Sequence, residues 1–387
     1  METDAKLPLS GLRVIAVEQA AAAPFCSRQL ADMGADVIKV ERPDGGDFAR
    51  DYDGALHGLS AYFAWLNRGK RSIVLDLKDS PDRGVFAKML ARADVLLHNL
   101  APGALDRLGF GYETVAERHP RLIWCGISGY GPDGPYRDKK AYDMLVQAES
   151  GVISLTGTAG APAKVGISMA DIASGFYGYS SILAALINRG RTGRGERIEI
   201  SMLECLAEWM MAPIYVWRGT GKSPERAGAR HNMIVPYGAY ACADGIVYFS
   251  IQNDREWRRF CSVVLELPAL ADEERFATNE RRLRNRIELE SLIEERLGAL
   301  PRSAVLRLLD QASIANSQMN DVAGVVNHPQ LAARHRWVDV DSPVGVIPAL
   351  IPPHNLEHAA SRMGAVPALG EHTQEILAEL GLESRSD

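Results

Sequence analysis

Short apolar runs alternate with segments of helical periodicity through the first third of the chain. A run of four to six apolar residues is typical of a buried strand, and apolar positions three or four apart are typical of a helix that packs on a core. Strands that alternate with helices predict crossover connections and a mostly parallel sheet with helices on both faces. The expected strands are Leu12–Val17, Val37–Val40, Ser72–Leu77, Val95–His98 and Leu122–Ile127, and the expected helices are Pro24–Met33, Asp82–Arg92 and Tyr112–Arg118.

The pattern changes in the second half of the chain. Gly219–Arg230 lacks apolar periodicity and is rich in glycine and charge, which indicates a linker. An Asp244-Gly245 pair between two apolar stretches then predicts a β-hairpin. The further expected elements are helices at Ile172–Asn188, Met202–Trp217, 254–264, 279–297 and 371–380, and a strand at Arg197–Ile200.

We therefore predict an α/β protein with more than one domain, because 387 residues exceed the size of one ordinary core. Residues 1–218 are expected to form the N-terminal part of a large domain. Residues 219–325 are expected to form the linker and a smaller α+β domain. Residues 326–387 are expected to return to the large domain.

Composition narrows the classes of partner. The net charge of −6 gives no overall basic field, so we expect neither nucleic acid nor a membrane as a partner. The five cysteines include no short pair of the kind that holds zinc, and we expect no metal. No signal peptide is evident, and no uninterrupted apolar run reaches the ~18 residues of a membrane span. The expected location is the cytoplasm.

Open parallel sheets bind ligands in the loops that follow the carboxyl ends of their strands. Here those loops are 18–24, 41–47, 99–107 and 128–142. The last of them contains Gly129-Tyr-Gly131-Pro-Asp-Gly134, which satisfies the spacing of a dinucleotide fingerprint. Pro132 favours a turn where that fingerprint needs the start of a helix, so we reject this interpretation.

Asp171 is the strongest candidate for chemistry. It lies among small and apolar residues where a long helix is expected to begin, and the positive end of a helix dipole favours an ionised carboxylate. Such a carboxylate attacks activated electrophiles such as a thioester or a phosphoryl group. No phosphate-binding Walker loop and no serine nucleophile elbow is present. The alternative is that Asp171 only caps the helix, because aspartate is a preferred N-cap residue.

Cations occur singly in the predicted ligand loops. Cations dispersed in this way can meet a ligand that carries several phosphates at separate points. The alternative is that each is a solvated surface side chain. The residues are Arg42, Lys70 with Arg71, Arg107, and Lys139 with Lys140.

Several motifs in sequence order resemble those of the class III CoA-transferases, the family that includes formyl-CoA transferase, carnitine CoA-transferase and the α-methylacyl-CoA racemases. The resemblance extends over nearly the whole chain. The motifs are Val37-Ile-Lys-Val-Glu-Arg42-Pro with Gly45-Gly-Asp47, Asn67-Arg-Gly-Lys70, Asp94-Val-Leu-Leu-His-Asn99-Leu100 through Arg107, Lys140-Ala-Tyr142-Asp143 and Pro367-Ala-Leu-Gly-Glu-His-Thr373.

The resemblance implies a Rossmann-like large domain, a small domain and a homodimer of two interlocked chains. It also implies that coenzyme A thioesters and carboxylates are the substrates, with no tightly bound cofactor, and that Asp171 is the catalytic residue. By the same resemblance, the residues that contact CoA are Ala21, Ala22, Arg42, Asn67, Lys70, Asn99, Leu100, Arg107 and Lys140, with Tyr142 in the same pocket. Formyl-CoA transferases carry glutamine at the position of Ala21.

Tyr142 distinguishes the branches of this family, because the racemases carry histidine at this position. Racemisation needs two groups that exchange protons near neutral pH, and tyrosine, with an ordinary pKa of about 10, suits this poorly. In a transferase Tyr142 need only line the pocket or donate a hydrogen bond, and simple packing is the alternative.

The stretch 230–240, which includes Arg230, His231 and Gly238, resembles the branch that acts on carnitine and dicarboxylates. Arg230 or His231 could hold a distal carboxylate, or the loop could only be anchored by ordinary hydrogen bonds. The leading hypothesis is a CoA-transferase that uses a succinyl-CoA-like donor and mesaconate, itaconate, citramalate or malate. A racemase or epimerase is the second hypothesis, and a non-enzymatic protein that binds CoA esters is the third.

Overall fold

The computed structural model describes residues 7–383 and divides into two compact units. The first unit contains residues up to Gly151, Val165–Met210, and residues from Gln330 onward. The second unit contains Val152–Lys164 and Met211–Pro329. The short segment 152–164 thus belongs with the second unit, although it interrupts the first in sequence.

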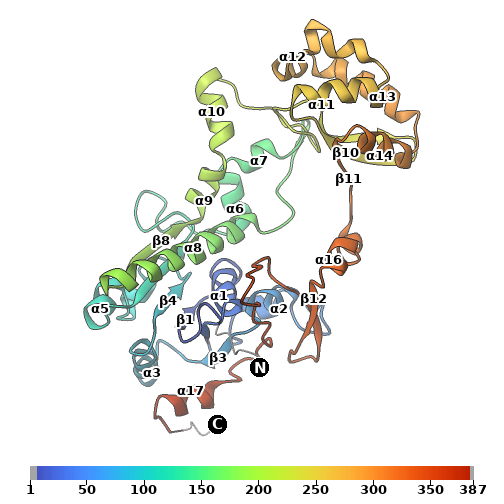
Figure 1. The fold of residues 1–387 in the computed structure, drawn as a ribbon. Helices are drawn as coiled ribbons and strands as arrows, with labels where there is room; N and C mark the ends of the chain where they lie inside the picture. Colours follow the sequence, from blue (N-terminus) through green and yellow to red (C-terminus); the bar gives the residue numbers. More distant parts are fainter. Residues whose placement is uncertain (1–6, 384–387) are drawn as a thin grey trace. The chain divides into compact units, whose positions relative to one another are not determined.

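A six-stranded parallel sheet organises the first unit (Figure 1). The strand order is β3-β2-β1-β4-β5-β8, so the direction of the crossovers reverses between β1 and β4, and such a reversal opens a crevice at the carboxyl ends of these two strands. The expectation of an α/β protein with a mostly parallel sheet is confirmed. The strands are β1 (Arg13–Val17), β2 (Asp36–Glu41), β3 (Arg71–Val74), β4 (Val95–His98), β5 (Ile123–Ser128) and β8 (Arg197–Ser201).

Helices cover both faces of this sheet. On one face, Ile15, Leu96 and Trp124 of the strands share a core with side chains of α3 (Ser80–Leu90), α5 (Tyr112–Arg118) and the terminal helix α17 (Thr373–Glu379). The C-terminal segment therefore completes the core of the first unit. On the other face lie α1 (Ala22–Asp32) and α8 (Met169–Thr192), which pack against each other.

The remaining elements of the first unit are shorter. They include a β-hairpin from the C-terminal segment, whose Val340 and Ile347 form a small core with Phe63. The elements are η1 (Phe48–Asp51), α2 (Ala61–Asn67), α4 (Ala104–Arg107), α6 (Asp143–Glu149), α9 (Met202–Trp209), β12 (Trp337–Val340) and β13 (Ile347–Leu350).

The second unit is built on a small antiparallel sheet of order β11-β10-β9, with the predicted Asp-Gly hairpin between β9 and β10. Trp257, Phe260, Leu289 and Leu309 are buried in its core. Its elements are α7 (Val152–Leu155), β6 (Gly157–Thr158), β7 (Ala161–Pro162), α10 (Met211–Thr220), β9 (Tyr237–Cys242), β10 (Gly245–Ser250), α11 (Asp254–Arg259), the π-helix η2 (Phe260–Val264), η3 (Pro268–Asp272), η4 (Glu274–Phe276), α12 (Asn279–Arg284), α13 (Arg286–Gly298), α14 (Arg302–Gln311), β11 (Ala315–Gln318) and α15 (Val322–Val326). Helix α16 (Pro329–Ala333) begins at the last residue of this unit and continues in the first unit.

Three helix predictions need correction. The single helix expected over 279–297 is two helices, because α12 ends at Arg284 and α13 begins at Arg286. The single helix expected over Met202–Trp217 is wrong, because α9 ends at Trp209 and α10 begins at Met211. Pro213 explains the break, since proline has no backbone N–H to donate and is tolerated only in the first turn of a helix. Asp171 is not the N-cap of α8 either; the N-cap is Ser168, and Asp171 lies in the first turn.

Helix α8 also has the length and composition of a membrane span, with a mean hydropathy of 1.2 over its most apolar window. Of that window, 44% is buried within the protein, and a core helix of a soluble protein passes the same test. The expectation that no segment would qualify relied on uninterrupted apolar runs. Serine, tyrosine and glycine interrupt the apolar run in α8, but the mean hydropathy of the helix stays high enough for a membrane span.

Candidate functional site

The loop after β1 lies at the crevice between β1 and β4 and is held on both sides. Asn99, which follows β4, accepts a hydrogen bond from the Gln19 N–H (2.9 Å) and donates one to the Gln19 carbonyl (2.8 Å). Asp47 accepts a hydrogen bond from the Ala20 N–H (2.9 Å). Ala20 has a φ of 61°, a backbone conformation that non-glycine residues seldom adopt. The entry to α1 is therefore fixed in a strained conformation by two loops from neighbouring strands.

A buried ionic cluster lies beneath this loop. It consists of Glu18, Lys39, Asp47 and Lys70, and the side chains of Glu18, Lys39 and Lys70 are fully buried. Lys70 Nζ lies 2.6 Å from Glu18 Oε1, and Lys39 Nζ lies 2.8 Å from Asp47 Oδ2. Burial lowers the pKa of Lys70 to about 8, although Glu18 opposes the change. Burial would also lower the pKa of Lys39, but Asp47 and Glu18 outweigh it and raise that pKa.

Asp171 lies in the first turn of α8, next to the buried Ala170 and Ala173. Burial raises the pKa of Asp171 to about 7, and the nearby Asp143 carboxylate adds to this effect. A carboxylic acid that titrates near neutral pH inside a partly buried pocket is a candidate catalytic group. Both protonation states of Asp171 are therefore accessible near physiological pH.

Two glycines bring α1 directly against α8. A Cβ atom on Gly175 would lie 2.5 Å from the carbonyl oxygen of Ala22, and one on Gly178 would lie 3.2 Å from Cδ1 of Ile127. The start of α1 therefore contacts α8 one turn beyond Asp171. This contact brings Ala21 and Ala22, both predicted to contact CoA, close to the predicted catalytic residue.

Aromatic side chains surround the same region. Tyr52 and Tyr62 pack edge to face with ring centroids 5.8 Å apart, and Trp65 contacts Tyr62 at 6.0 Å. Burial raises the pKa of Tyr52 to about 12, with further contributions from Asp47 and Asp171. Tyr142 is 62% exposed. Asp171 is thus bordered by rings, and Tyr142 can pack against a ligand.

The predicted polar and cationic ligand residues fall into two groups. Arg42, Arg107 and Lys140 are exposed at the loops after the strands, where a phosphate-bearing ligand can reach them. Asn67 and Lys70 are instead buried, and Lys70 donates hydrogen bonds to Asn67 Oδ1 (2.9 Å) and to the Pro24 carbonyl (3.1 Å). These two residues support the site from beneath. Leu100 is half-buried beside Asn99.

The predicted substrate-loop residues belong to the second unit and are internally bonded there. Arg230 forms ion pairs with Glu290 and Glu294 and lies over the ring of Tyr240. His231 accepts hydrogen bonds from the Met233 and Ile234 N–H groups, each at 3.1 Å. A Cβ on Gly238 would lie 2.5 Å from Arg230 Cα, so glycine allows the two segments to pair. Any substrate carboxylate at Arg230 would have to compete with two protein carboxylates.

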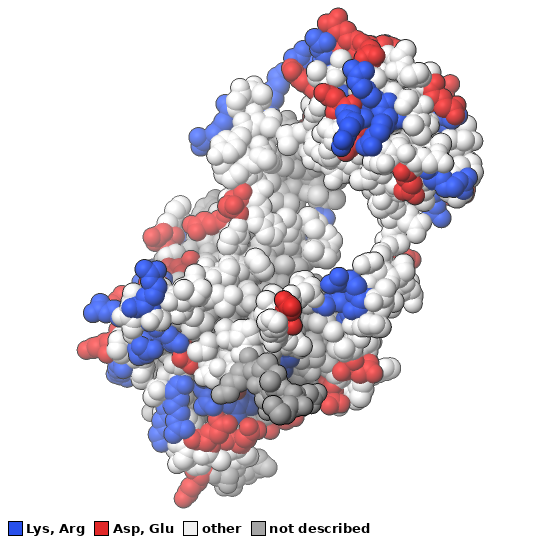
Figure 2. Space-filling view, in the orientation of Figure 1, with Lys and Arg blue, Asp and Glu red and all other residues white. Residues whose placement is uncertain are grey.

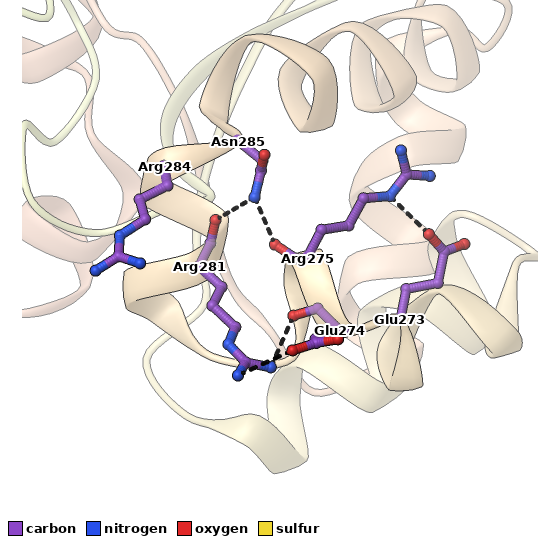
Figure 3. Close-up of a pocket in the computed structure, with 6 residues that line it drawn as sticks. All are labelled: Glu273, Glu274, Arg275, Arg281, Arg284 and Asn285. Carbon is purple, nitrogen blue, oxygen red and sulfur yellow. Dashed lines mark hydrogen bonds and ion pairs between the residues drawn. The ribbon is translucent and has the colours of Figure 1, made fainter.

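Two cavities of the protein have linings that do not include Asp171. One of about 270 Å³ lies below the loops after β4 and β5, with His98, Trp124 and Arg137 among the residues that line it. The other, in the second unit, is shown in Figure 3. Its charges pair with one another, because Arg275 meets Glu273 at 2.8 Å and Arg281 meets Glu274 at 3.3 Å. The face of the protein in Figure 2 likewise carries interspersed acidic and basic side chains. Within residues 7–383, no group of three or more His, Cys, Asp or Glu side chains could hold a metal ion.

Asp143 and Gln147 are two residues near Asp171 for which the sequence predicted no role. Asp143 belongs to the motif Lys140-Ala-Tyr142-Asp143, and its position four residues before Gln147 places the two on one face of a helix. That spacing was the available signal. It does not reveal that the pair contacts the start of α8.

Comparison with known proteins gives one consistent result. Residues 9–373 match the family model described as CoA-transferase family III. A succinate–glutarate CoA-transferase of Agrobacterium fabrum is 37% identical, covering 97% of this chain and 96% of the relative. An acetyl-CoA:oxalate CoA-transferase of Acetobacter aceti is 39% identical over 86% of each chain. A succinyl-CoA:mesaconate CoA-transferase of Haloarcula marismortui is 34% identical over 97% of each. The crystal structure of a CAIB/BAIF family protein from Brucella suis has a TM-score of 0.84 and 36% identity, covering 97% of this chain and 100% of the other.

Proposed function

The chain belongs to CoA-transferase family III, and from this premise we propose that it moves CoA from a succinyl-CoA-like donor to a small dicarboxylate, with Asp171 as the nucleophile. Mesaconate, itaconate, citramalate and malate are the proposed acceptors from the sequence, and glutarate and oxalate join them because relatives carry those names. The observation that carries the proposal is the placement of Asp171, a partly buried carboxylate with a pKa of about 7 in the first turn of α8.

The proposed reaction passes through two covalent intermediates. Ionised Asp171 attacks the thioester carbonyl carbon and the C–S bond breaks. CoA leaves as the thiolate, and a mixed anhydride between Asp171 and the donor acyl group remains. The thiolate then attacks the aspartyl carbonyl and expels the donor carboxylate, which leaves an aspartyl-CoA thioester. The acceptor carboxylate attacks this thioester, and the same steps in reverse release the new acyl-CoA and regenerate Asp171.

Each step develops negative charge on a carbonyl oxygen, which needs hydrogen-bond donors. The first-turn N–H groups of α1 are candidates, because its N-cap residue Ala21 makes no side-chain cap and no acidic residue lies in that turn. The Gly175 N–H is less suitable, because a residue in the interior of a helix donates to the carbonyl one turn earlier. Ala22 contacts α8 beside Gly175 through its carbonyl oxygen, so its N–H points toward the N-terminal end of α1.

The acceptor preference is supported by the relatives rather than by a free cation in the second unit. Arg230 is already paired with Glu290 and Glu294. If Arg230 binds the distal carboxylate of the acceptor, Arg230→Ala should raise the KM for dicarboxylates far more than the KM for monocarboxylates. An equal change for both classes would indicate that Arg230 only anchors the loop.

We also propose an interlocked homodimer in the cytoplasm. Exposed aromatic side chains on α10, Tyr215 and Trp217, and the 85% exposed Ile287 of α13 are large apolar groups that a second chain would cover. The cysteines are unpaired and mostly buried, which suits a reducing compartment.

The test is to incubate the protein with succinyl-CoA and a panel of carboxylic acids and to identify new thioesters by mass. We expect transfer to at least one dicarboxylate, and hydroxylamine should trap CoA-loaded wild-type enzyme. Asp171→Asn should lower the rate by at least about 10³-fold, because the nucleophile is lost, while CoA still binds. Asp339→Asn, an exposed aspartate of β12 outside the predicted ligand loops, is the matched control and should behave as wild type.

Transfer to none of the acids would contradict the proposal. So would deuterium incorporation at the α-carbon of an acyl-CoA in the absence of an acceptor, because that exchange belongs to a racemase and not to a transferase.

A further inference from the structure

The Asp143 carboxylate connects α6 to α8. One of its oxygens accepts a hydrogen bond from the Ala170 N–H (2.7 Å), in the first turn of α8. The other accepts one from Nε2 of Gln147 (2.8 Å), one turn further along α6. Both oxygens of Asp143 are therefore bonded within the protein.

Gln147 extends this connection to the segment that leads into α8. Its side chain is fully buried. Its Oε1 accepts a hydrogen bond from the Val165 N–H (3.0 Å), and its Nε2 also donates to the Ile167 carbonyl (3.3 Å). Asp143 and Gln147 together fix three backbone positions, 165, 167 and 170, just before Asp171.

Helix α8 needs this support because its own N-cap does not supply it. Ser168 is the N-cap residue, but its side chain makes no cap hydrogen bond; its Oγ pairs with the Tyr62 hydroxyl at 3.0 Å. The first N–H groups of a helix have no partner within the helix. The Ala170 N–H is one of these groups, and it donates to the carboxylate of Asp143, which belongs to α6. As a result, two carboxylates, Asp143 and Asp171, share the positive end of one helix.

We propose that Asp143, held in place by Gln147, is a positioning residue for the nucleophile Asp171: it fixes the first turn of α8 through Ala170 and places a second negative charge beside Asp171. This inference rests on the proposed function of Asp171. The Asp143 carboxylate accepts two hydrogen bonds, and its charge disfavours a second charge nearby. It therefore adds to the effect of burial on Asp171, which becomes a more basic and hence stronger nucleophile in its ionised form.

Three tyrosines lie around this end of α8. Tyr52, which follows η1, interacts electrostatically with Asp171, Tyr142 and Asp47, and Tyr62 from α2 contacts Ser168. None of these tyrosines supplies a positive charge that would offset Asp143. The influence of Asp143 on Asp171 is therefore open to measurement by removing one charge.

The test compares Asp143→Asn with wild type. Asparagine keeps an oxygen for the Ala170 N–H and removes the charge, but its NH₂ group faces Nε2 of Gln147. The double variant Asp143→Asn/Gln147→Glu provides an acceptor there, keeps one for the Val165 N–H, loses the donor to the Ile167 carbonyl, and moves the charge along α6 away from Asp171. It also serves as the test if Asp143→Asn alone does not fold. Asp339→Asn, in β12, is the matched surface control.

The readout is the formation of the aspartyl-CoA thioester on the enzyme in a single turnover without acceptor, followed by mass as a function of pH, with thermal unfolding to confirm the fold. In both Asp143 variants we expect the acidic limb of the profile to move down by about one pH unit, the usual effect of losing a nearby like charge. The single variant should also lose rate several-fold at high pH, and the double variant should recover part of it. Asp339→Asn should change neither.

An unchanged acidic limb in both variants would overturn the inference, whether or not the rate falls, because a merely structural residue lowers the rate at every pH alike. Failure of the proposed function gives a different result, since wild type would then form no aspartyl-CoA thioester at any pH. In that case isotope-edited infrared titration of the Asp171 carboxyl still decides the matter, and an identical titration in wild type and Asp143→Asn would overturn the inference.

Discussion

At the scale of the residue, the proposed chemistry depends on a carboxylate, Asp171, whose ionised form is disfavoured by its surroundings. Burial is the larger cause, and Asp143 adds like charge, so the pKa of Asp171 rises from 3.8 to about 7. A carboxylate in water is too weakly basic to attack a thioester efficiently. Burial raises its basicity and still leaves a large ionised fraction near neutral pH.

This pKa predicts the pH dependence of the reaction. Only ionised Asp171 attacks the thioester, so kcat/KM for the acyl-CoA should rise with pH through about 7 and level off above about pH 8. Initial rates between about pH 5.5 and 9 check this. A profile that is flat from about pH 5 upward would mean that Asp171 keeps its ordinary pKa or is not the nucleophile.

The same pKa predicts an effect on stability. Because the folded pKa lies above the unfolded value of 3.8, the folded state loses stability as pH rises from about 4 to about 7. Asp171→Asn removes the ionised group and should raise the free energy of unfolding at about pH 8 by about 2–4 kcal/mol, with little change near pH 4. Denaturant titrations at the two pH values measure this. Equal effects at both would contradict the raised pKa.

At the scale of the element, the site depends on how closely α1 approaches α8. The approach is set by Gly175, which faces the Ala22 carbonyl, and by Gly178, which faces Cys26 and Ile127. A larger residue at either position would separate the first turn of α1 from Asp171. Two helices that each could form alone become a site only because one of them carries glycine at the crossing.

Gly175→Ala should therefore separate the helices, because the new Cβ would lie 2.5 Å from the Ala22 oxygen. We expect a loss of about 1–3 kcal/mol in the free energy of unfolding and a lower kcat/KM. Gly190→Ala is the matched control on the same helix, since a Cβ there meets nothing within 4 Å. That change should stabilise the protein by about 0.5–1 kcal/mol, as expected for alanine in place of glycine in a helix. Thermal and chemical denaturation of both variants decide the comparison.

At the scale of the whole molecule, the first unit is held together at the ligand edge by buried charge as well as by apolar packing. Glu18 follows β1, Lys39 lies in β2, and Lys70 precedes β3, so their ion pairs connect three adjacent strands. Removing one partner from a buried pair leaves an uncompensated charge, which costs far more than replacing both.

Lys70→Met should thus lower the free energy of unfolding by about 3–5 kcal/mol, because Glu18 is left without its nearest cation. The double variant Glu18→Gln/Lys70→Met should recover part of that loss. Urea denaturation measures both, and CoA affinity is measured alongside. If Lys70→Met instead weakened CoA binding with no loss of stability, Lys70 would contact CoA directly.

Local pattern predicted the elements well where one face of a strand or helix is apolar. Strand β4 and helix α5 coincide with their expected ranges, and the other strands of the sheet differ by a few residues at their ends. The prediction failed at Met210. Two helices meet there, although the apolar periodicity continues through this position as in a single helix. It also gave no sign of α2 or α6, which are short and carry too few apolar positions to establish a helical period.

By itself, the sequence determined the order of strands and helices, the parallel sheet, the family, and Asp171 as the residue to examine, because each depends on residue type and on spacing along the chain. Only the tertiary structure decided that Lys70 points inward to Glu18, that Asp143 supports the first turn of α8, and that Ala22 contacts Gly175. These are contacts between residues far apart in sequence. Their existence depends on how helices and strands pack, and no periodicity within one segment encodes which side chain of another segment it will meet.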